Sequence, residues 1–245
     1  MRTALITGAN KSIGFETARQ LAQKGYFIYL ASRDLEKGQE AASQLKKEGL
    51  ANIEAIQIDV ADKASIKKAA ATLDEKGVTL DILINNAGIL GPVPQPPSTT
   101  DTDLIREVFN TNFFGTINMN QAFIPLLRKS ASPVIVNVTS GLASLTLHSD
   151  PSWIYYTIKS AAYGPSKTAL NAYTISLAYE LKDTPFRVNT IDPGHTKTDF
   201  NRHRGTGSVE DAAAFVAKYA MIGPNGPTGR FFSKDYAGEG NESPW

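Results

Sequence analysis

Short apolar segments alternate with longer amphipathic ones along most of this chain, and this alternation restricts its fold more than any other feature. Two short segments, 80–84 and 134–138, are apolar throughout, which is typical of strands buried on both faces. The longer segments repeat their apolar residues with the period of a helix. The expected strands are 4–6, 26–30, 53–58, 80–84 and 134–138, and the expected helices are 13–24, 34–47, 62–76 and 101–129.

Strand–helix alternation predicts βαβ units, and their crossovers place helices on both faces of a parallel sheet. We therefore expect a doubly wound, Rossmann-like α/β fold with about six or seven strands. Composition does not divide the 245-residue chain, so a single domain over 1–245 is predicted. The last strand is expected at 230–233. The polar segment 238–245 is expected to be a flexible tail or to dock on a neighbouring molecule through Trp245.

Charge and cysteine content exclude several classes of function. The chain has 25 Lys and Arg against 24 Asp and Glu, a formal charge of +1, which argues against binding nucleic acid or an anionic membrane. It has no cysteine, so disulfides, thiol nucleophiles and Cys-ligated zinc are excluded. The three histidines lack metal-ligand spacing, and no metal site is predicted. We expect a cytoplasmic protein, since we find neither a membrane span nor a signal peptide.

The first expected strand leads directly into a glycine-containing turn, and a helix follows. In such a turn, backbone N–H groups and the positive helix N-terminus face a pyrophosphate without an obstructing side chain. The position after the first strand of a βαβ chain makes the motif more specific than glycine spacing alone. The residues predicted to bind phosphate here are Gly8, Asn10, Lys11, Ser12, Ile13 and Gly14.

A turn of the form T-G-x-x-x-G-I-G that opens a chain of this length resembles the short-chain dehydrogenase/reductase family. One departure is Ser12, which replaces the middle glycine. Its small side chain and hydroxyl are compatible with phosphate, but serine adopts a positive φ poorly. Further segments lie where the family places its cofactor contacts. By this resemblance, the other residues expected to contact the cofactor are Asp59, Val60, Asn86, Ala87, Gly88, Pro193, Gly194, Thr196 and Thr198.

The end of the second strand indicates which nicotinamide cofactor is used. An NAD site normally has an acidic residue there to bind the adenine ribose, whereas this chain has Arg33. Its guanidinium can bind a 2′-phosphate, and Lys11 adds a second cation. Asp34 is the alternative ribose ligand, but its position before a helix favours an N-cap. The sequence thus favours NADP(H).

A general acid is needed to protonate the oxygen of a reduced carbonyl, and two Tyr-x-x-x-Lys pairs are candidates. An ammonium one helical turn from a phenol favours the phenolate and should lower the phenol pKa. The pair Tyr155–Lys159 is followed by Pro165, whereas Tyr163–Lys167 is followed by an uninterrupted helical pattern. Because proline is tolerated only near a helix start, Tyr163 is expected in the first turn, where the dipole also favours a phenolate. We therefore predict Tyr163 and Lys167 as the catalytic pair.

The resemblance assigns the remaining roles at the site. Ser140 would orient the carbonyl, with Thr139 as the neighbouring alternative. Tyr163 would be the general acid, and Lys167 would bind the nicotinamide ribose and lower the phenol pKa. Asn112 would hold a water that links Lys167 to solvent. The segment 141–162 is longer than in most family members and rich in aromatic residues, so it either contacts substrate or forms a surface loop.

The resemblance implies an NADPH-dependent reductase of ketones or aldehydes, which oxidises an alcohol with NADP⁺ in the reverse direction. An idle NADP(H)-binding protein is the alternative, but it has no need of Asn112, Ser140, Tyr163 and Lys167 together. A nucleotide-sugar epimerase would have glycine at position 11 and a C-terminal domain. The partners expected are a small carbonyl substrate and, through the helices that hold Asn112 and Tyr163, a second copy in a dimer or tetramer. The long insertion before Tyr163 leaves a monomer open.

Overall fold

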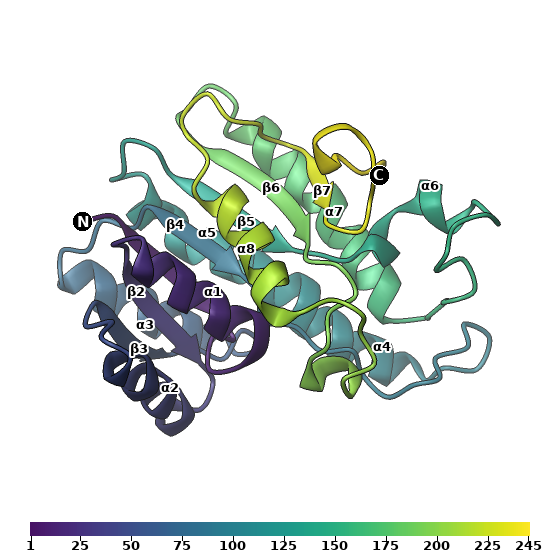
Figure 1. Cartoon of the computed structure of the whole chain (residues 1–245), viewed down its shortest axis with the longest axis horizontal. Coiled ribbons are helices and arrows are strands. Elements are labelled where there is room, and N and C mark those ends of the chain that lie inside the picture. The colour runs from purple at the N-terminus through teal and green to yellow at the C-terminus, as the bar shows by residue number, and fades with distance from the viewer.

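A seven-stranded parallel sheet forms the centre of the computed structural model, which describes residues 1–245 (Figure 1). Its strand order is β3-β2-β1-β4-β5-β6-β7, and each neighbouring pair is parallel. This confirms the doubly wound, single-domain α/β fold. The strands are β1 (Thr3–Thr7), β2 (Phe27–Ser32), β3 (Ile53–Gln57), β4 (Ile82–Asn85), β5 (Val134–Val138), β6 (Arg187–Asp192) and β7 (Phe231–Ser233).

Helices cover both faces of this sheet. One core cluster joins it to α1, α2 and α8, and a second joins it to α3, α5 and α7. None of the helices combines the length and apolar character needed to cross a bilayer. The α-helices are α1 (Ser12–Gln23), α2 (Leu35–Lys47), α3 (Lys63–Glu75), α4 (Thr102–Phe109), α5 (Gly115–Leu127), α6 (Leu145–His148), α7 (Tyr163–Glu180) and α8 (Val209–Ala220).

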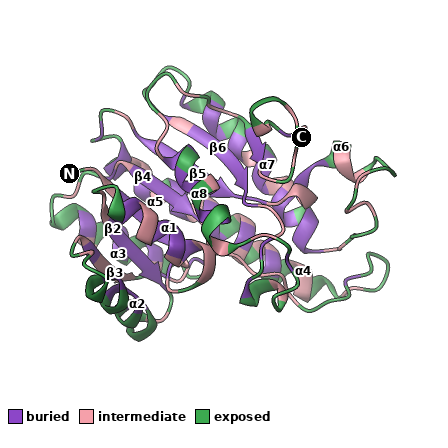
Figure 2. Ribbon diagram, in the orientation of Figure 1, coloured by how far each residue is buried: buried purple, intermediate pink, exposed green.

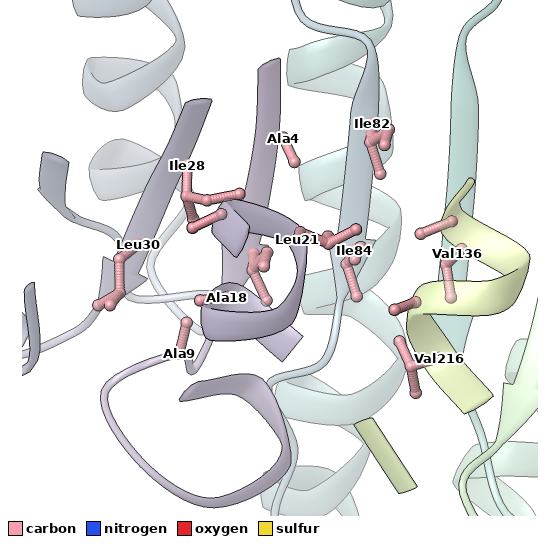
Figure 3. Packing of buried hydrophobic residues seen from close by; sticks show 14 of the residues in the cluster. Ala4, Ala9, Ala18, Leu21, Ile28, Leu30, Ile82, Ile84, Val136 and Val216 are labelled. Atoms are coloured by element: carbon pink, nitrogen blue, oxygen red, sulfur yellow. The ribbon is translucent and has the colours of Figure 1, made fainter. Parts of the chain in front are cut away.

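The central strands are buried on both sides, as their unbroken apolar sequences predict (Figure 2). Successive side chains of β1 alternate between the two clusters, because Ala4 and Ile6 belong to one and Leu5 to the other. Figure 3 shows the first cluster, in which Leu21 of α1 and Val216 of α8 approach the same face of the sheet. Both helices therefore bury their apolar sides against this face.

The order of the strands reverses between β1 and β4. The chain moves outward from β1 to β3, then returns to pair β4 with the other side of β1. In doubly wound sheets, ligands bind outside the carboxyl ends of the strands at such a reversal. The glycine-containing turn follows β1 at this point, so the topology places the predicted cofactor site there.

The expected helix 101–129 is interrupted by one π-helical segment. Asn110–Phe114 lies between α4 and α5, and Pro125 is within the last turn of α5. A π-helical turn shifts the register of side chains along a helix and is frequent at functional sites. Asn112 lies within this segment and is fully buried. The interruption thus directs Asn112 toward the carboxyl edge of the sheet.

The C-terminal segment 238–245 packs on its own chain rather than extending from it as a flexible tail. Ser243 N donates to Phe231 O at 2.8 Å, and Phe232 and Glu242 form an isolated bridge. The Trp245 ring lies 5.7 Å from the Phe231 ring. Thr146 donates twice to Trp245 O, through its N at 3.0 Å and Oγ1 at 2.8 Å. Tertiary contacts to β7 and α6 therefore hold this polar segment.

Gly115→Ala should destabilise the protein, although alanine is the better helix former. An added Cβ at Gly115 would lie 2.7 Å from Val60 O, a backbone atom that cannot move aside. Overpacking of this kind costs about 1–3 kcal/mol, more than the roughly 1 kcal/mol gained in helix propensity. Chemical denaturation should show a lower midpoint.

Gly38→Ala in α2 is the matched control. Its added Cβ would meet only the Ser32 Cβ at 3.3 Å and the Ala55 Cβ at 3.6 Å. The gain in helix propensity should offset this tight contact, so the stability of Gly38→Ala should stay within about 1 kcal/mol of wild type. Equal losses in both variants would contradict the role assigned to the Val60 carbonyl.

Candidate active site

The candidate site lies at the carboxyl edge of the sheet, where loops from four strands converge. The glycine-containing turn follows β1, and the segment 86–88 follows β4. Ser140 follows β5, and the segment 193–198 follows β6. Parallel strands present their carboxyl ends at the same edge, so residues distant in sequence meet here.

The turn after β1 is fixed by the segment after β4. Thr7 Oγ1 accepts from the backbone N of Asn86 and of Ala87, both at 3.0 Å, and Asn86 Nδ2 donates to Thr7 O at 2.9 Å. Gly8 has a φ of +62°, and a Cβ on Gly14 would lie 2.6 Å from both Asn86 Nδ2 and Gly8 O. Both glycines are thus required. Asn86 directly supports the turn predicted to bind phosphate.

Ser12 adopts the left-handed conformation that serine tolerates poorly. Its φ is +52°, so the departure from the family pattern places a non-glycine residue where glycine is preferred. Such a conformation costs about 1–2 kcal/mol. Lys11, the N-cap of α1, makes no side-chain capping hydrogen bond, which leaves the first N–H groups of α1 available to an anion. A strained turn at a helix N-terminus is consistent with a binding site.

Arg33 and Asp59 meet at one cavity of about 400 Å³ beside the ends of β2 and β3. Lys68 of α3 supplies a second cation there, and sequence analysis missed it because it is one of several lysines on α3. The other residues that line this cavity are Gln57, Asp62, Ala64 and Ser65. The structure therefore places a guanidinium and an ammonium where the resemblance expects the adenine end of a cofactor.

Lys11 and Asp34 are placed differently from Arg33. The Lys11 ammonium lies 3.0 Å from the Asp199 carboxylate. Lys11 does not line the cavity that contains Arg33, so the structure does not bring these two cations together. Asp34 caps α2, because its side chain accepts from Lys37 N at 3.2 Å. This capping bond, followed by the Lys37 charge, lowers the pKa of the Asp34 carboxyl. The N-cap interpretation of Asp34 is confirmed.

Tyr163, Ser140 and Lys167 converge beside the end of β5. Tyr163 is the first residue of α7, as predicted from Pro165, and the Ser140 side chain lies close enough to its phenol to oppose the rise of the phenol pKa. Lys167 Nζ donates to Val138 O at 2.8 Å. Thr139, the alternative to Ser140, instead donates its hydroxyl to Asn171 Oδ1 at 2.8 Å. The Thr139 hydroxyl is thus engaged with α7, whereas Ser140 lies beside the phenol.

Asn112 connects the loop after β4 to the start of α7. Its Nδ2 donates to Ile89 O at 2.9 Å and to Ser166 Oγ at 3.0 Å, and its Oδ1 accepts from Ile89 N at 2.8 Å. Ser166 Oγ in turn donates to Tyr163 O at 2.7 Å. A Cβ placed on Gly88 would lie 3.1 Å from Asn112 Oδ1 and 3.5 Å from Lys167 Nζ. These groups therefore share one small volume, which only glycine at position 88 leaves open.

Gln95 is a supporting residue that the sequence did not reveal. It is 2% exposed, and its Oε1 accepts from Ala162 N at 3.2 Å and Tyr163 N at 3.3 Å. Its Nε2 donates to Leu90 O at 2.8 Å and Pro92 O at 2.9 Å. The Gln95 side chain thus ties the proline-rich loop 91–97 to the start of α7. No local pattern indicates this contact, because 67 positions separate Gln95 from Ala162.

Burial dominates the electrostatics of the pair. It raises the pKa of the Tyr163 phenol, an effect that the Ser140 hydrogen bond opposes and the Asp192 charge reinforces. Burial also lowers the pKa of the Lys167 ammonium to about 8. The sequence predicts that Lys167 lowers the phenol pKa, whereas the structure has it raised because desolvation disfavours the phenolate. Both groups are thus shifted toward their neutral forms.

The other Tyr-x-x-x-Lys pair is held apart from this site. Lys159 Nζ donates to His148 O at 2.7 Å, and Tyr155 OH lies 3.4 Å from Asp235 Oδ2. Neither residue lies on an α-helix. This arrangement supports the choice of Tyr163 and Lys167.

The insertion extends with α6 to one side of the sheet (Figure 1), and its aromatic residues form a ladder. The rings of His148 and Trp153 lie 5.4 Å apart, as do those of Trp153 and Tyr155. Tyr155 meets His195 of the segment after β6 at 5.7 Å. A Cβ on Gly141 would lie 3.6 Å from Trp153, so the ladder borders the residue after Ser140.

The segment after β6 folds back over the site. Gly194 has a φ of +80°, Thr196 and Thr198 are buried, and Asn201 Nδ2 donates to Thr196 O at 2.9 Å. Phe200 then reaches Tyr163, with the two ring centroids 5.4 Å apart. This segment therefore forms part of the wall around the phenol.

Lys167→Met should change how stability depends on pH. The Lys167 pKa is depressed from 10.5 to about 8, so the unfolded state binds more protons between these pH values and wild-type stability rises with pH there. The stability advantage of Lys167→Met over wild type should therefore shrink by roughly 3 kcal/mol from pH 7 to pH 10.5. Urea unfolding at several pH values measures this change.

Lys159→Met provides the same substitution at an exposed lysine and corrects for the effect of methionine itself. Its stability difference from wild type should stay nearly constant over the same pH range. A Lys167→Met difference that is independent of pH would contradict a buried ammonium at position 167.

Comparison with known proteins identifies the family. The family model for short chain dehydrogenases matches residues 2–208. (+)-Neomenthol dehydrogenase of Capsicum annuum is 34% identical over 94% of this chain and 95% of its own. The structure of salutaridine reductase from Papaver somniferum is similar, with a TM-score of 0.83 and 31% identity, over 96% of this chain and all of that one.

NADPH-bound carbonyl reductase from chicken fatty liver also has a similar structure. Its TM-score is 0.83 and its identity 27%, over 100% of this chain and 99% of that one. The matches thus span the strands, the glycine-containing turn and the Tyr163 region. The chain therefore belongs to the short-chain dehydrogenase/reductase family of oxidoreductases.

Proposed function

We propose that this protein is an NADPH-dependent carbonyl reductase that converts a small ketone or aldehyde to an alcohol. The observation that carries the proposal is that Ser140, Tyr163 at the start of α7 and Lys167 one helical turn later converge at the end of β5. The named activities of the similar proteins, a neomenthol dehydrogenase, a salutaridine reductase and a carbonyl reductase, support it. An NADP(H)-binding protein without catalytic activity would not need Asn112 beside Ser140, Tyr163 and Lys167.

The residues present fit a nicotinamide dinucleotide. Gly8 and Gly14 bring backbone close to the first turn of α1, whose N–H groups can bind the pyrophosphate. Arg33 and Lys68 would hold a 2′-phosphate in the cavity beside β2 and β3. Lys167 and the segment 193–198 would hold the nicotinamide riboside. When bound, this cofactor supplies the hydride.

Tyr163 would supply the proton. Its raised pKa keeps the phenol protonated at neutral pH, which is the form a general acid needs before reduction. The Ser140 side chain lies near the same phenol, so a substrate carbonyl placed between them can accept from both hydroxyls. After proton transfer, the Lys167 ammonium would stabilise the phenolate. The expected homo-oligomer stays a prediction.

Tyr163→Phe should abolish NADPH-dependent ketone reduction, because it removes only the hydroxyl that donates the proton. General acid catalysis contributes about 10²–10⁴-fold, so kcat should fall by at least about 100-fold while NADPH binding stays within about 3-fold. Absorbance of NADPH against a panel of ketones, aldehydes and quinones measures turnover, and fluorescence titration measures binding.

Tyr155→Phe is the matched control and should keep most activity. It removes a hydroxyl from the other Tyr-x-x-x-Lys pair. The proposal fails if Tyr155→Phe is inactive and Tyr163→Phe is active. Both variants are compared on a ketone, aldehyde or quinone that the wild-type enzyme reduces. If the wild-type enzyme reduces none of these compounds, the result favours an NADP(H)-binding protein without catalytic activity.

Arg33→Ala should weaken NADPH binding about 10- to 100-fold and NADH binding by less than about 3-fold. Only NADPH carries the 2′-phosphate, and a charge-assisted hydrogen bond to it is worth about 1.5–3 kcal/mol. Lys37→Ala removes a nearby charge outside the cavity and should affect neither cofactor. Titrations of each variant with both cofactors distinguish these results, and equal losses for Arg33→Ala would exclude the phosphate role.

A further inference from the structure

A buried carboxylate with no assigned role lies behind the reactive groups. Asp192 is the last residue of β6 and is 5% exposed. Its Oδ1 accepts from Gly194 N at 3.0 Å, and its Oδ2 accepts from Ser233 Oγ at 2.7 Å. The carboxylate also lies close to Gly141. One side chain therefore joins three segments around the candidate site.

These three contacts lie next to groups that the proposed reaction uses. Gly141 directly follows Ser140, and a Cβ on Gly141 would lie 3.2 Å from Asp192 Oδ2. Gly194 belongs to the segment expected to meet the nicotinamide. Ser233 belongs to β7, the edge strand, which lies beside β6. A displacement of Asp192 would therefore move both the carbonyl-orienting serine and the cofactor-facing loop.

The charge of Asp192 also acts on the phenol. Besides burial, this charge raises the pKa of the Tyr163 and Tyr155 phenols. The pKa of Asp192 itself is raised to about 6, mainly by burial and further by the charge of Asp235. The titratable side chains on the segments around Asp192 include Tyr163 and Lys167 of α7, together with Tyr155, His195, Lys234 and Asp235. Hydrogen bonds from Ser233 and Gly194 favour the carboxylate.

We propose that Asp192 is a positioning residue of this site, which fixes Ser140 through Gly141 and whose negative charge retains the proton on Tyr163. The inference rests on the proposed function, because it assigns Tyr163 as the proton donor. A negative charge near a phenol disfavours the phenolate, so Asp192 keeps the acid loaded before reduction. The same charge is unfavourable for the reverse reaction, which needs the phenolate. Asp192 should thus move the pH dependence of both directions to higher pH.

The pH profile of Asp192→Asn tests this role. Asparagine has nearly the same shape but no charge, so the phenolate should form more easily. The alkaline limb of kcat/KM for NADPH-dependent reduction should move to lower pH by roughly half a unit to one unit. The rising limb for alcohol oxidation should move in the same direction. Melting temperature and circular dichroism check that the variant is folded.

Two control variants separate charge from structure. Ser233→Ala removes a hydrogen bond but keeps the carboxylate, so it should lower kcat/KM without moving the alkaline limb. Asp235→Asn removes the other carboxylate, whose Oδ2 accepts from His195 N at 2.7 Å and which is not among the groups that shift the Tyr163 pKa. It should leave that limb in place. An Asp192→Asn profile with unshifted limbs would overturn the proposal and leave Asp192 a structural clamp.

Nuclear magnetic resonance tests the coupling without turnover. In the cofactor-free protein, the side-chain carboxyl ¹³C resonance of Asp192 is assigned as the one that is absent from the spectrum of Asp192→Asn. This resonance should titrate with a midpoint near pH 6. The Tyr163 ring ¹³Cζ resonance, assigned with Tyr163→Phe, should shift with the same midpoint, and Asp192→Asn should remove this step. A Tyr163 resonance that is constant between pH 5 and 7 would refute the coupling, whether or not the enzyme reduces carbonyls.

Discussion

The parallel pairing of seven strands is the constraint on which the site depends. Because all strands point the same way, the loops after β1, β4, β5 and β6 emerge at one edge, and residues from 7 to 198 meet there. Buried asparagines reinforce this edge. Asn85 Nδ2 on β4 donates to Asn120 Oδ1 on α5 at 2.8 Å and to Asn137 Oδ1 on β5 at 2.9 Å. The network ties neighbouring strands and a covering helix beneath the reactive groups.

Burial gives these groups their chemistry at a cost in stability. Tyr163 and Lys167 are both shifted toward their neutral forms, and Lys167 has one hydrogen bond to Val138 O. An ammonium in this setting is destabilising, because desolvation is only partly compensated. The strained φ of Ser12 adds a second local cost. The core clusters on both faces of the sheet offset these costs, so a protein of this size can retain an unfavourable site.

The sequence predicts features that depend on local patterns. Alternation predicts the sheet and its covering helices, and Pro165 predicts the start of α7 and thereby Tyr163. It does not predict contacts made across long distances along the chain. Gln95 meets Ala162 across 67 positions and Asp192 meets Ser233 across 41, and neither residue stands in a recognisable motif. The packing of Trp245 and the direction of the Tyr163 pKa shift likewise depend on tertiary burial, which no local pattern encodes.

The wall around Tyr163 is held more weakly than the groups beneath it. Asp199, next to Phe200, pairs with Lys11 and His203 through side chains that are at least half exposed, and such pairs are worth at most about 1 kcal/mol. Tyr163 and Asn112 are instead held by buried hydrogen bonds to Gln95 and Ser166. The aromatic ladder of the insertion adds apolar surface beside Ser140. Substrate shape can therefore be selected by these more weakly held segments, while the proposed proton donor is held at the start of α7.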